Sequence, residues 1–215
     1  MVALDEDESE YSWSSSDAAC SVAYVVVPVL ALLAGSTGKR VLDLGCGNGA
    51  LSALLVQRGY EVTGLDGSRS GIEVASQKYP ELTFAVHDIN DALPEDHRGV
   101  YDAVVSTEVI EHLYLPGRLL ERALEALKPN GLLVVSTPYH GYLKNLCLAV
   151  AGKWDFHHTS LRDYGHVKFF SRATLSALFA KHGFEVTAFR TAGRIPLLAK
   201  SMVMAGCAPT RRVHE

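Results

Sequence analysis

The chain has 215 residues, of which 48% are apolar, and its formal net charge is −4 with a pI near 6.1. This length allows one domain with a full hydrophobic core and leaves little room for a second. The acidic balance argues against a nucleic-acid substrate, because a phosphate backbone requires a basic surface, and it favours small molecules. The four cysteines are scattered without metal-type spacing, which favours a reducing, cytoplasmic location.

The N-terminal residues 1–16 form an acidic and serine-rich arm, which we expect to be disordered or to act as a lid. The arm has no basic region of the kind that secretory and mitochondrial signals carry. Residues 17–215 are expected to form the single domain. Its first helix is predicted within Ala18–Ala34, which is almost entirely apolar and contains Pro28. Since 17 residues are at the lower limit for a membrane span, we favour a helix packed on a sheet over a membrane anchor.

A glycine-rich turn follows this first helix. A short apolar strand is predicted over Arg40–Leu44 and a helix over Ala50–Arg58, with Gly45, Gly47 and Gly49 in the turn between them. Glycines let the backbone close on a ligand, while the next helix directs free N–H groups and its positive dipole end to the same place. This arrangement predicts a nucleotide-binding loop.

Strand and helix patterns alternate after the turn. Further strands are predicted over residues 61–65, 82–86, 101–106 and 132–136, and further helices over 70–79 and 116–127. Near the C-terminus, strands at Phe184–Arg190 and Ser201–Cys207 follow each other with only a loop between them. The pattern predicts an α/β fold with a mostly parallel sheet, helices on both faces and a final antiparallel hairpin. Ligands bind such sheets beyond the carboxyl ends of the strands.

Acidic residues stand where the first three strands meet this ligand edge. Asp43 precedes the glycines by two positions, Asp66 ends the second strand, and Asp88 follows the third. Together with the Asp-x-Gly-x-Gly-x-Gly turn, they resemble the class I S-adenosylmethionine-dependent methyltransferases over about Tyr11–Cys207. The resemblance implies a Rossmann-like, seven-stranded sheet and S-adenosylmethionine as the cofactor, with S-adenosylhomocysteine as its product. A dinucleotide-binding turn is the alternative, but its glycines are spaced G-x-G-x-x-G, and position 50 here is alanine.

The resemblance also implies which residues contact the cofactor. Asp43 and the Gly45–Gly49 backbone would hold its methionine part, Asp66 the ribose hydroxyls, and Asp88 the adenine amino group. A carboxylate suits the ribose because it accepts hydrogen bonds from the hydroxyls. The complete predicted set is Asp43, Gly45, Cys46, Gly47, Gly49, Asp66, Gly67, Asp88, Ile89, Thr107 and Glu108.

The fourth strand ends in Glu108-Val-Ile-Glu111-His112. With the later His166, this run resembles the ubiquinone-biosynthesis O-methyltransferases and, more distantly, the small-RNA 3′-terminal 2′-O-methyltransferases. The resemblance implies that Glu108, Glu111, His112 and His166 bind a divalent metal, which would lower the pKa of the acceptor oxygen and orient it. The alternative is a metal-free site in which Glu108 lines the cofactor pocket and His112 acts as the base. The catalytic candidates are His112, Glu108 and His166.

Residues 138–170 separate the fifth strand from the next clear helix, and they are rich in aromatic residues and histidines. Long insertions at the ligand edge are usually functional, so we interpret this one as a substrate cap. Tyr139, His140, His157 and His158 are candidates for substrate contact. The sequence does not determine the role of Trp154–His158.

The favoured function is methyl transfer to a hydroxyl of a small-molecule acceptor. Many amine methylases carry an Asn/Asp-Pro-Pro-aromatic motif after the fourth strand, where this chain has Ser106-Thr107-Glu108. An N- or C-methyltransferase and a non-catalytic, cofactor-binding partner subunit are the alternatives, and the acidic strand ends count against the partner subunit. No nucleic-acid partner and no stable membrane insertion are expected, while the acceptor and the oligomeric state stay open.

Overall fold

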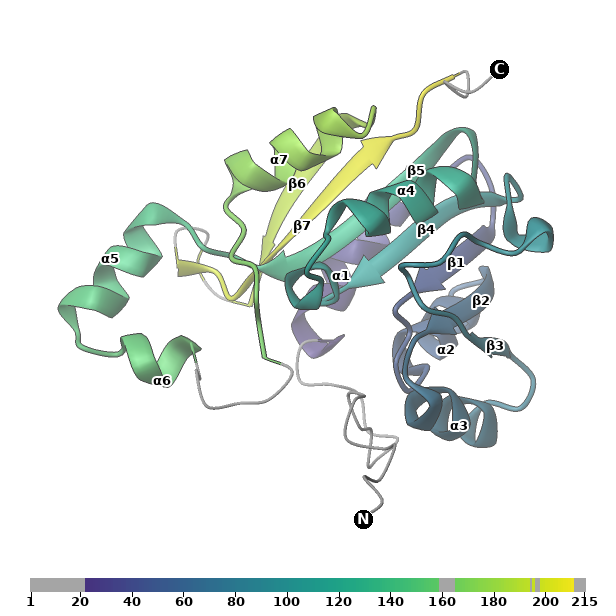
Figure 1. Cartoon of the computed structure of the whole chain (residues 1–215), viewed down its shortest axis with the longest axis horizontal. Helices are drawn as coiled ribbons and strands as arrows, with labels where there is room; N and C mark the ends of the chain where they lie inside the picture. The colour runs from purple at the N-terminus through teal and green to yellow at the C-terminus, as the bar shows by residue number, and fades with distance from the viewer. Residues whose placement is uncertain (1–21, 159–164, 194, 196–197, 211–215) are drawn as a thin grey trace, which may run out of the picture.

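The computed structural model of the chain describes residues 22–158, 165–193, 195 and 198–210. The predicted N-terminal arm, 1–16, and the start of the predicted first helix lie outside the described residues. Seven strands form one sheet in the order β3-β2-β1-β4-β5-β7-β6 (Figure 1).

The sheet is parallel except at β7. Its strands are β1 (Arg40–Leu44), β2 (Glu61–Asp66), β3 (Thr83–Val86), β4 (Tyr101–Thr107), β5 (Leu127–Pro138), β6 (Glu185–Ala192) and β7 (Ser201–Cys207). The pairs among β1 to β5 are parallel, and β7 is antiparallel to both of its neighbours, β5 and β6. The predicted mostly parallel sheet with an antiparallel C-terminal hairpin is therefore confirmed.

Helices cover both faces of the sheet, as predicted. They are α1 (Val22–Leu33), α2 (Ala50–Gln57), α3 (Arg69–Lys78), α4 (Gly117–Ala126), α5 (Tyr142–Val150), α6 (Trp154–His158) and α7 (Arg172–Lys181), with short 3₁₀ helices η2 (Glu95–His97) and η3 (Ile110–His112). A hydrophobic core lies on each face of the sheet, and side chains of β4 alternate between the two. Ala103 and Val105 pack with α1 and α2, whereas Val104 packs with α4 and α7. This alternation follows from the two-residue period of a strand.

The apolar stretch before the glycine turn is α1, and it packs against β5, β6 and β7. Val25, Val29 and Leu33 are completely buried there. The apolar side chains of α1 therefore pack in the core, as the predicted helix on the sheet requires. Among the described residues, no helix combines the length and the apolar character that crossing a membrane requires.

β5 begins earlier than predicted. The sequence predicted the strand only from residue 132, yet residues 127–131 already belong to it, and the pairing with β4 shifts register between Tyr101 and Ala103. Asn130 has a φ of 60° at this point. The Pro-Asn-Gly residues, which are typical of turns, therefore form a bulge that inserts extra residues without ending the pairing.

The segment between β5 and α7 contains two helices, α5 and α6, so the prediction of no clear helix there was wrong. They lie together beyond the end of the sheet at which β5 ends (Figure 1). The burial of α5 is inverted, because Tyr142 and Val150 are 83% and 81% exposed whereas Lys144 is 8% exposed. An apolar stripe that faces outward does not mark a core-packed helix, which is why the sequence pattern failed here.

Candidate active site

The glycine turn after β1 needs glycine for reasons within the protein itself. Gly45, Gly47 and Gly49 have φ values of 84°, 53° and 73°, in the left-handed region that disfavours other residues. A Cβ at position 45 would lie 2.4 Å from Cγ2 of Val109, and one at position 49 would lie 2.7 Å from the ring of Phe84. The turn therefore combines an unusual backbone with close packing, and α2 begins directly after it.

Asp66 joins the end of β2 to the glycine turn. Its Oδ2 accepts a hydrogen bond of 2.7 Å from the backbone N–H of Gly47, and its Oδ1 accepts one of 2.7 Å from Ser68. Each carboxylate oxygen can accept more than one hydrogen bond, so capacity for ribose hydroxyls is left. Gly67, also predicted to contact the cofactor, separates Asp66 from the start of α3.

Asp43 lies beneath the turn, completely buried in β1. Its Oδ2 accepts a 2.6 Å hydrogen bond from Oγ of Ser52, whereas its Oδ1 is buried with no hydrogen-bond partner in the described part of the chain. Burial raises the pKa of this carboxyl to about 7, the Ser52 hydrogen bond opposes the increase, and the charge of Asp66 adds to it. A buried oxygen without a partner fits a ligand ammonium group, such as that of a methionine moiety.

The raised pKa of Asp43 predicts a stability change with pH. A shift from 3.8 to about 7 means that the folded protein binds this proton more tightly than the unfolded chain. The resulting stability is complete below pH 3.8 and is lost as the pH rises through 7, by roughly 4 kcal/mol in all. We expect Asp43→Asn to remove this loss, so denaturant unfolding without ligand should show the variant gaining relative to the parent between pH 4 and 8. If the stabilities of the parent and of Asp43→Asn changed with pH in the same way, the raised pKa of Asp43 would be contradicted.

The predicted adenosine contacts lie along the same edge. Asp66 pairs with Val86 at the end of β3, and Asp88 follows two residues later. Asp88 is exposed, and its Oδ1 accepts hydrogen bonds from the backbone N–H and the side-chain amide of Asn90, at 2.8 and 2.9 Å. Ile89 packs against the core beside it. The parallel order β3-β2-β1 thus brings these residues next to the glycine turn.

Glu108 follows Thr107 at the carboxyl end of β4 and has a strained backbone, with a φ of 54°. Its carboxylate accepts hydrogen bonds from Oγ of Ser136, at 2.7 Å, and from Oγ of Ser201, at 3.1 Å. Burial raises the pKa of Glu108, while these two hydrogen bonds and the charge of Lys144 oppose the increase. Its carboxylate is therefore held by β5 and β7.

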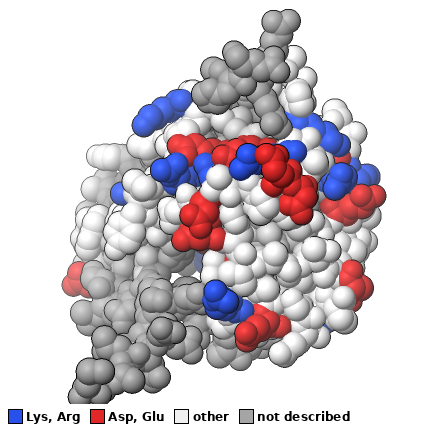
Figure 2. Space-filling model, turned by 45° about the vertical axis from the view of Figure 1, so that its right-hand side comes forward, with Lys and Arg blue, Asp and Glu red and all other residues white. Residues whose placement is uncertain are grey.

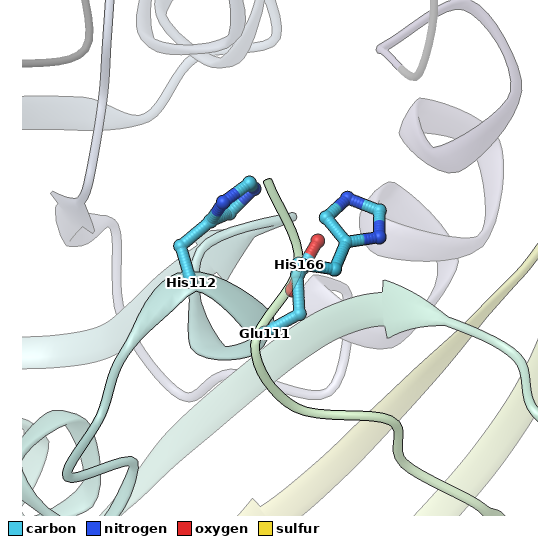
Figure 3. Close-up of side chains that lie close together, drawn as sticks. All are labelled: Glu111, His112 and His166. Carbon is cyan, nitrogen blue, oxygen red and sulfur yellow. The ribbon is translucent and has the colours of Figure 1, made fainter. Parts of the chain in front are cut away.

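Three of the four predicted metal ligands come together. Ligand atoms of Glu111, His112 and His166 all lie within 4.8 Å of one another, and Glu108 is outside this group. Figure 3 shows the two imidazoles on either side of the Glu111 carboxylate, with His166 contributed by a separate stretch of chain. Backbone N–H groups of Val167 and Lys168 both donate to the carbonyl oxygen of Glu111, at 2.9 Å, and this holds the later segment in place.

The donor set of this group fits a divalent ion. Glu111 is completely buried; Oγ1 of Thr137 donates to its Oε2 at 2.9 Å, and its Oε1 is buried with no partner among the described residues. Burial raises the pKa of Glu111, and the negative charge of Glu108 raises it further. A cation would stabilise the charged carboxylate, and one carboxylate with two imidazoles suits a borderline metal.

Sequence reasoning missed the residues that hold these carboxylates. Ser136 and Thr137 carry a weak signal, because they are polar residues at the end of an apolar strand. Ser201 and Lys144 carry none, since each reaches Glu108 only through the fold: Ser201 through the antiparallel placement of β7, and Lys144 through the inverted packing of α5.

The fold and the glycine turn are those of a class I methyltransferase, and the comparisons agree. Residues 22–188 match the family described as methyltransferase domain, so the chain belongs to this family of S-adenosylmethionine-dependent methyltransferases. It is 34% identical over 158 residues to the ubiquinone biosynthesis O-methyltransferase of Azorhizobium caulinodans, covering 70% of this chain and 60% of that protein. The chain thus spans about 60% of the length of this curated relative.

Two solved structures show the same fold. One is a methyltransferase in complex with the Haloferax volcanii Trm112 methyltransferase activator, with a TM-score of 0.67 and 21% identity over 86% of this chain and 90% of that chain. The other is the methyltransferase domain of a bacterial Hen1, with a TM-score of 0.64 and 25% identity over 85% of this chain and 97% of that chain.

Proposed function

We propose that this methyltransferase methylates a hydroxyl oxygen of a small-molecule acceptor, assisted by a divalent metal held by Glu111, His112 and His166. The observation that carries the proposal is the convergence of these three side chains at the carboxyl end of β4. The name of the similar ubiquinone biosynthesis O-methyltransferase supports oxygen as the acceptor atom.

The residues have separate roles in this proposal. The glycine turn and Asp66 hold S-adenosylmethionine, which supplies an electrophilic methyl group when bound, and Asp43 lies beneath the turn. A metal at the three side chains would supply Lewis acidity to the acceptor hydroxyl. In the metal-free alternative, His112 would take the hydroxyl proton, because proton removal and alignment are what methyl transfer requires of the protein. Glu108, held by hydrogen bonds from Ser136 and Ser201, lines the cofactor side of the site in this proposal.

The surface supports a small acceptor. On the face shown in Figure 2, acidic and basic side chains lie next to one another and form no continuous basic surface. A nucleic-acid substrate would require such a surface, since affinity for a phosphate backbone comes largely from lysine and arginine.

An acceptor panel tests the proposal. The full chain is incubated with S-adenosylmethionine, Mn²⁺ and matched phenols, anilines and thiols, and S-adenosylhomocysteine is quantified by mass spectrometry. Product formation with phenols or catechols, lost when their hydroxyls are already methylated, supports oxygen transfer. Turnover of the anilines alone would favour nitrogen, and cofactor binding without any turnover would favour a non-catalytic subunit.

The ribose role of Asp66 predicts a measurable loss of affinity. Asp66→Ala removes a carboxylate partner of the cofactor and leaves the N–H groups of Gly47 and Ser68 without their acceptor. We expect the Kd for S-adenosylhomocysteine to rise about tenfold or more, as charge-assisted hydrogen bonds contribute about 1.5–3 kcal/mol. Calorimetry measures the Kd, with Asp66→Asn as the matched variant that keeps an acceptor oxygen. An unchanged Kd in Asp66→Ala would refute the assignment.

A further inference from the structure

A second histidine cluster lies where the end of β5 meets α5 and α6, outside the site described above. The ring centroids of His140 and His158 are 5.6 Å apart in a stacked arrangement, and those of His140 and His157 are 6.0 Å apart. The ring of Phe169 lies against His140 and His158, at 5.0 Å from each. Nothing in the proposed methyl transfer uses these histidines.

The cluster contains buried polar atoms without partners. His140 is 8% exposed, and its ring nitrogens have no hydrogen-bond partner among the described residues other than the side chain of Asn145. Within the same part of the chain, Nε2 of His158 is buried without a partner. Buried polar groups are nearly always hydrogen-bonded in folded proteins, so these atoms call for an explanation such as a ligand.

The charge at the cluster favours an anion. Lys144 is 8% exposed, and its Nζ donates to the carbonyl oxygens of Tyr139, at 2.9 Å, and Lys200, at 3.4 Å. Burial first, and then the positive charge of Lys144, His158 and His157, lowers the pKa of His140 to about 4, and a hydrogen bond with Asn145 only partly opposes this decrease. The charges that lower this pKa are all positive, so they would repel a cation and attract an anion.

We propose that His140 and His158, with Lys144 behind them, form a subsite for a carboxylate substituent of the acceptor. The inference rests on the proposed function, since it names a chemical feature of its substrate. His166, at the proposed metal site, and Phe169, at the cluster, are three residues apart, which limits their Cα separation to about 10 Å. One acceptor can therefore place its hydroxyl at the first site and its acidic group at the second.

Binding is tested directly and without turnover. The full chain, labelled with ¹³C at the histidine rings and saturated with S-adenosylhomocysteine, is titrated with 4-hydroxyphenylacetate, its amide and inorganic phosphate while ring resonances are followed by NMR. The variants His140→Phe and His158→Phe keep the ring volume and assign the signals. His97→Phe is the matched control, because His97 precedes β4 at the opposite end of the sheet and bonds to Tyr101.

We expect the carboxylate to shift the His140 and His158 resonances and to bind about tenfold more tightly than the amide. His140→Phe should remove this preference, and His97→Phe should preserve it. Equal binding of acid and amide, shifts confined to other histidines, or no binding at all would overturn the proposal. Shifts caused by inorganic phosphate and not by the carboxylate would also overturn it, as they would mark a site for the free ion. Methyl transfer is measured separately, so a preserved anion preference without product formation would count against the proposed function alone.

Discussion

Gly47→Val is expected to abolish binding of S-adenosylmethionine while the fold survives. Gly47 is buried, has a φ of 53°, and donates its N–H to Asp66, the residue assigned to the ribose. A β-branched side chain at this φ is strained and would occupy the space into which the ligand must approach. Calorimetry with S-adenosylhomocysteine should therefore detect no binding, a loss of at least about 100-fold relative to the parent chain.

The control for backbone strain is Gly59→Val. Gly59 follows the C-terminal end of α2, has a φ of 85°, and a Cβ there would meet no atom within 4 Å. This variant carries the cost of a positive φ without filling a binding site, so it should lose stability and keep its affinity for the ligand. Circular dichroism checks that both variants are folded. Normal affinity in folded Gly47→Val would remove the glycine turn from the cofactor site.

His166→Ala is expected to lower turnover on the order of 100-fold and to weaken Mn²⁺ binding, with the affinity for S-adenosylhomocysteine unchanged. The variant removes one of three converging donors and leaves the glycine turn, which lies on other elements, intact. EDTA treatment of the parent should produce the same loss, and added Mn²⁺ should restore turnover to the parent and not to the variant. Electron paramagnetic resonance of Mn²⁺ reports the binding itself.

His97→Ala is the control for this experiment, because it removes a histidine remote from the group. Comparing Glu108→Gln with Glu111→Gln distinguishes the roles of the two carboxylates. Glu108 accepts hydrogen bonds from Ser136 and Ser201, whereas Glu111 lies in the cluster with His112 and His166. We expect Glu111→Gln to weaken Mn²⁺ binding more than Glu108→Gln does. Full turnover in metal-stripped protein that binds no Mn²⁺ would refute the metal and leave His112 as the base.

Features that depend on residues close together in the sequence could be predicted from it. The glycine turn is an example, because three alternating glycines between an apolar strand and a helix specify their own backbone. The acidic ends of β1 and β2 are another, since Asp43 and Asp66 meet once two parallel strands are neighbours. The hairpin of β6 and β7 also follows from local order, because a short connection between adjacent strands requires them to be antiparallel.

Contacts between distant segments could be predicted only as hypotheses. The resemblance grouped Glu108 with Glu111, His112 and His166, but spacing along the chain does not determine where a side chain at a positive φ points. In the fold, Glu108 has a positive φ, and its carboxylate bonds to side chains of β5 and β7. His166 is more than fifty residues away in sequence, and the hydrogen bonds that Val167 and Lys168 donate to the carbonyl oxygen of Glu111 hold it beside Glu111.

The segment between β5 and α7 shows most clearly what the tertiary structure alone decided. A sequence pattern assumes that apolar side chains face the core, and α5 reverses this by burying Lys144 and exposing Tyr142. The reason lies in its neighbours: the ammonium group of Lys144 donates hydrogen bonds to the backbone carbonyl oxygens of Tyr139, just after β5, and of Lys200, just before β7. The residues alone determined the class of protein and the glycine turn, because those depend on short-range geometry. Which residues lie on the proposed acceptor side depends on contacts between buried polar groups from distant segments, and only the folded chain brings these groups together.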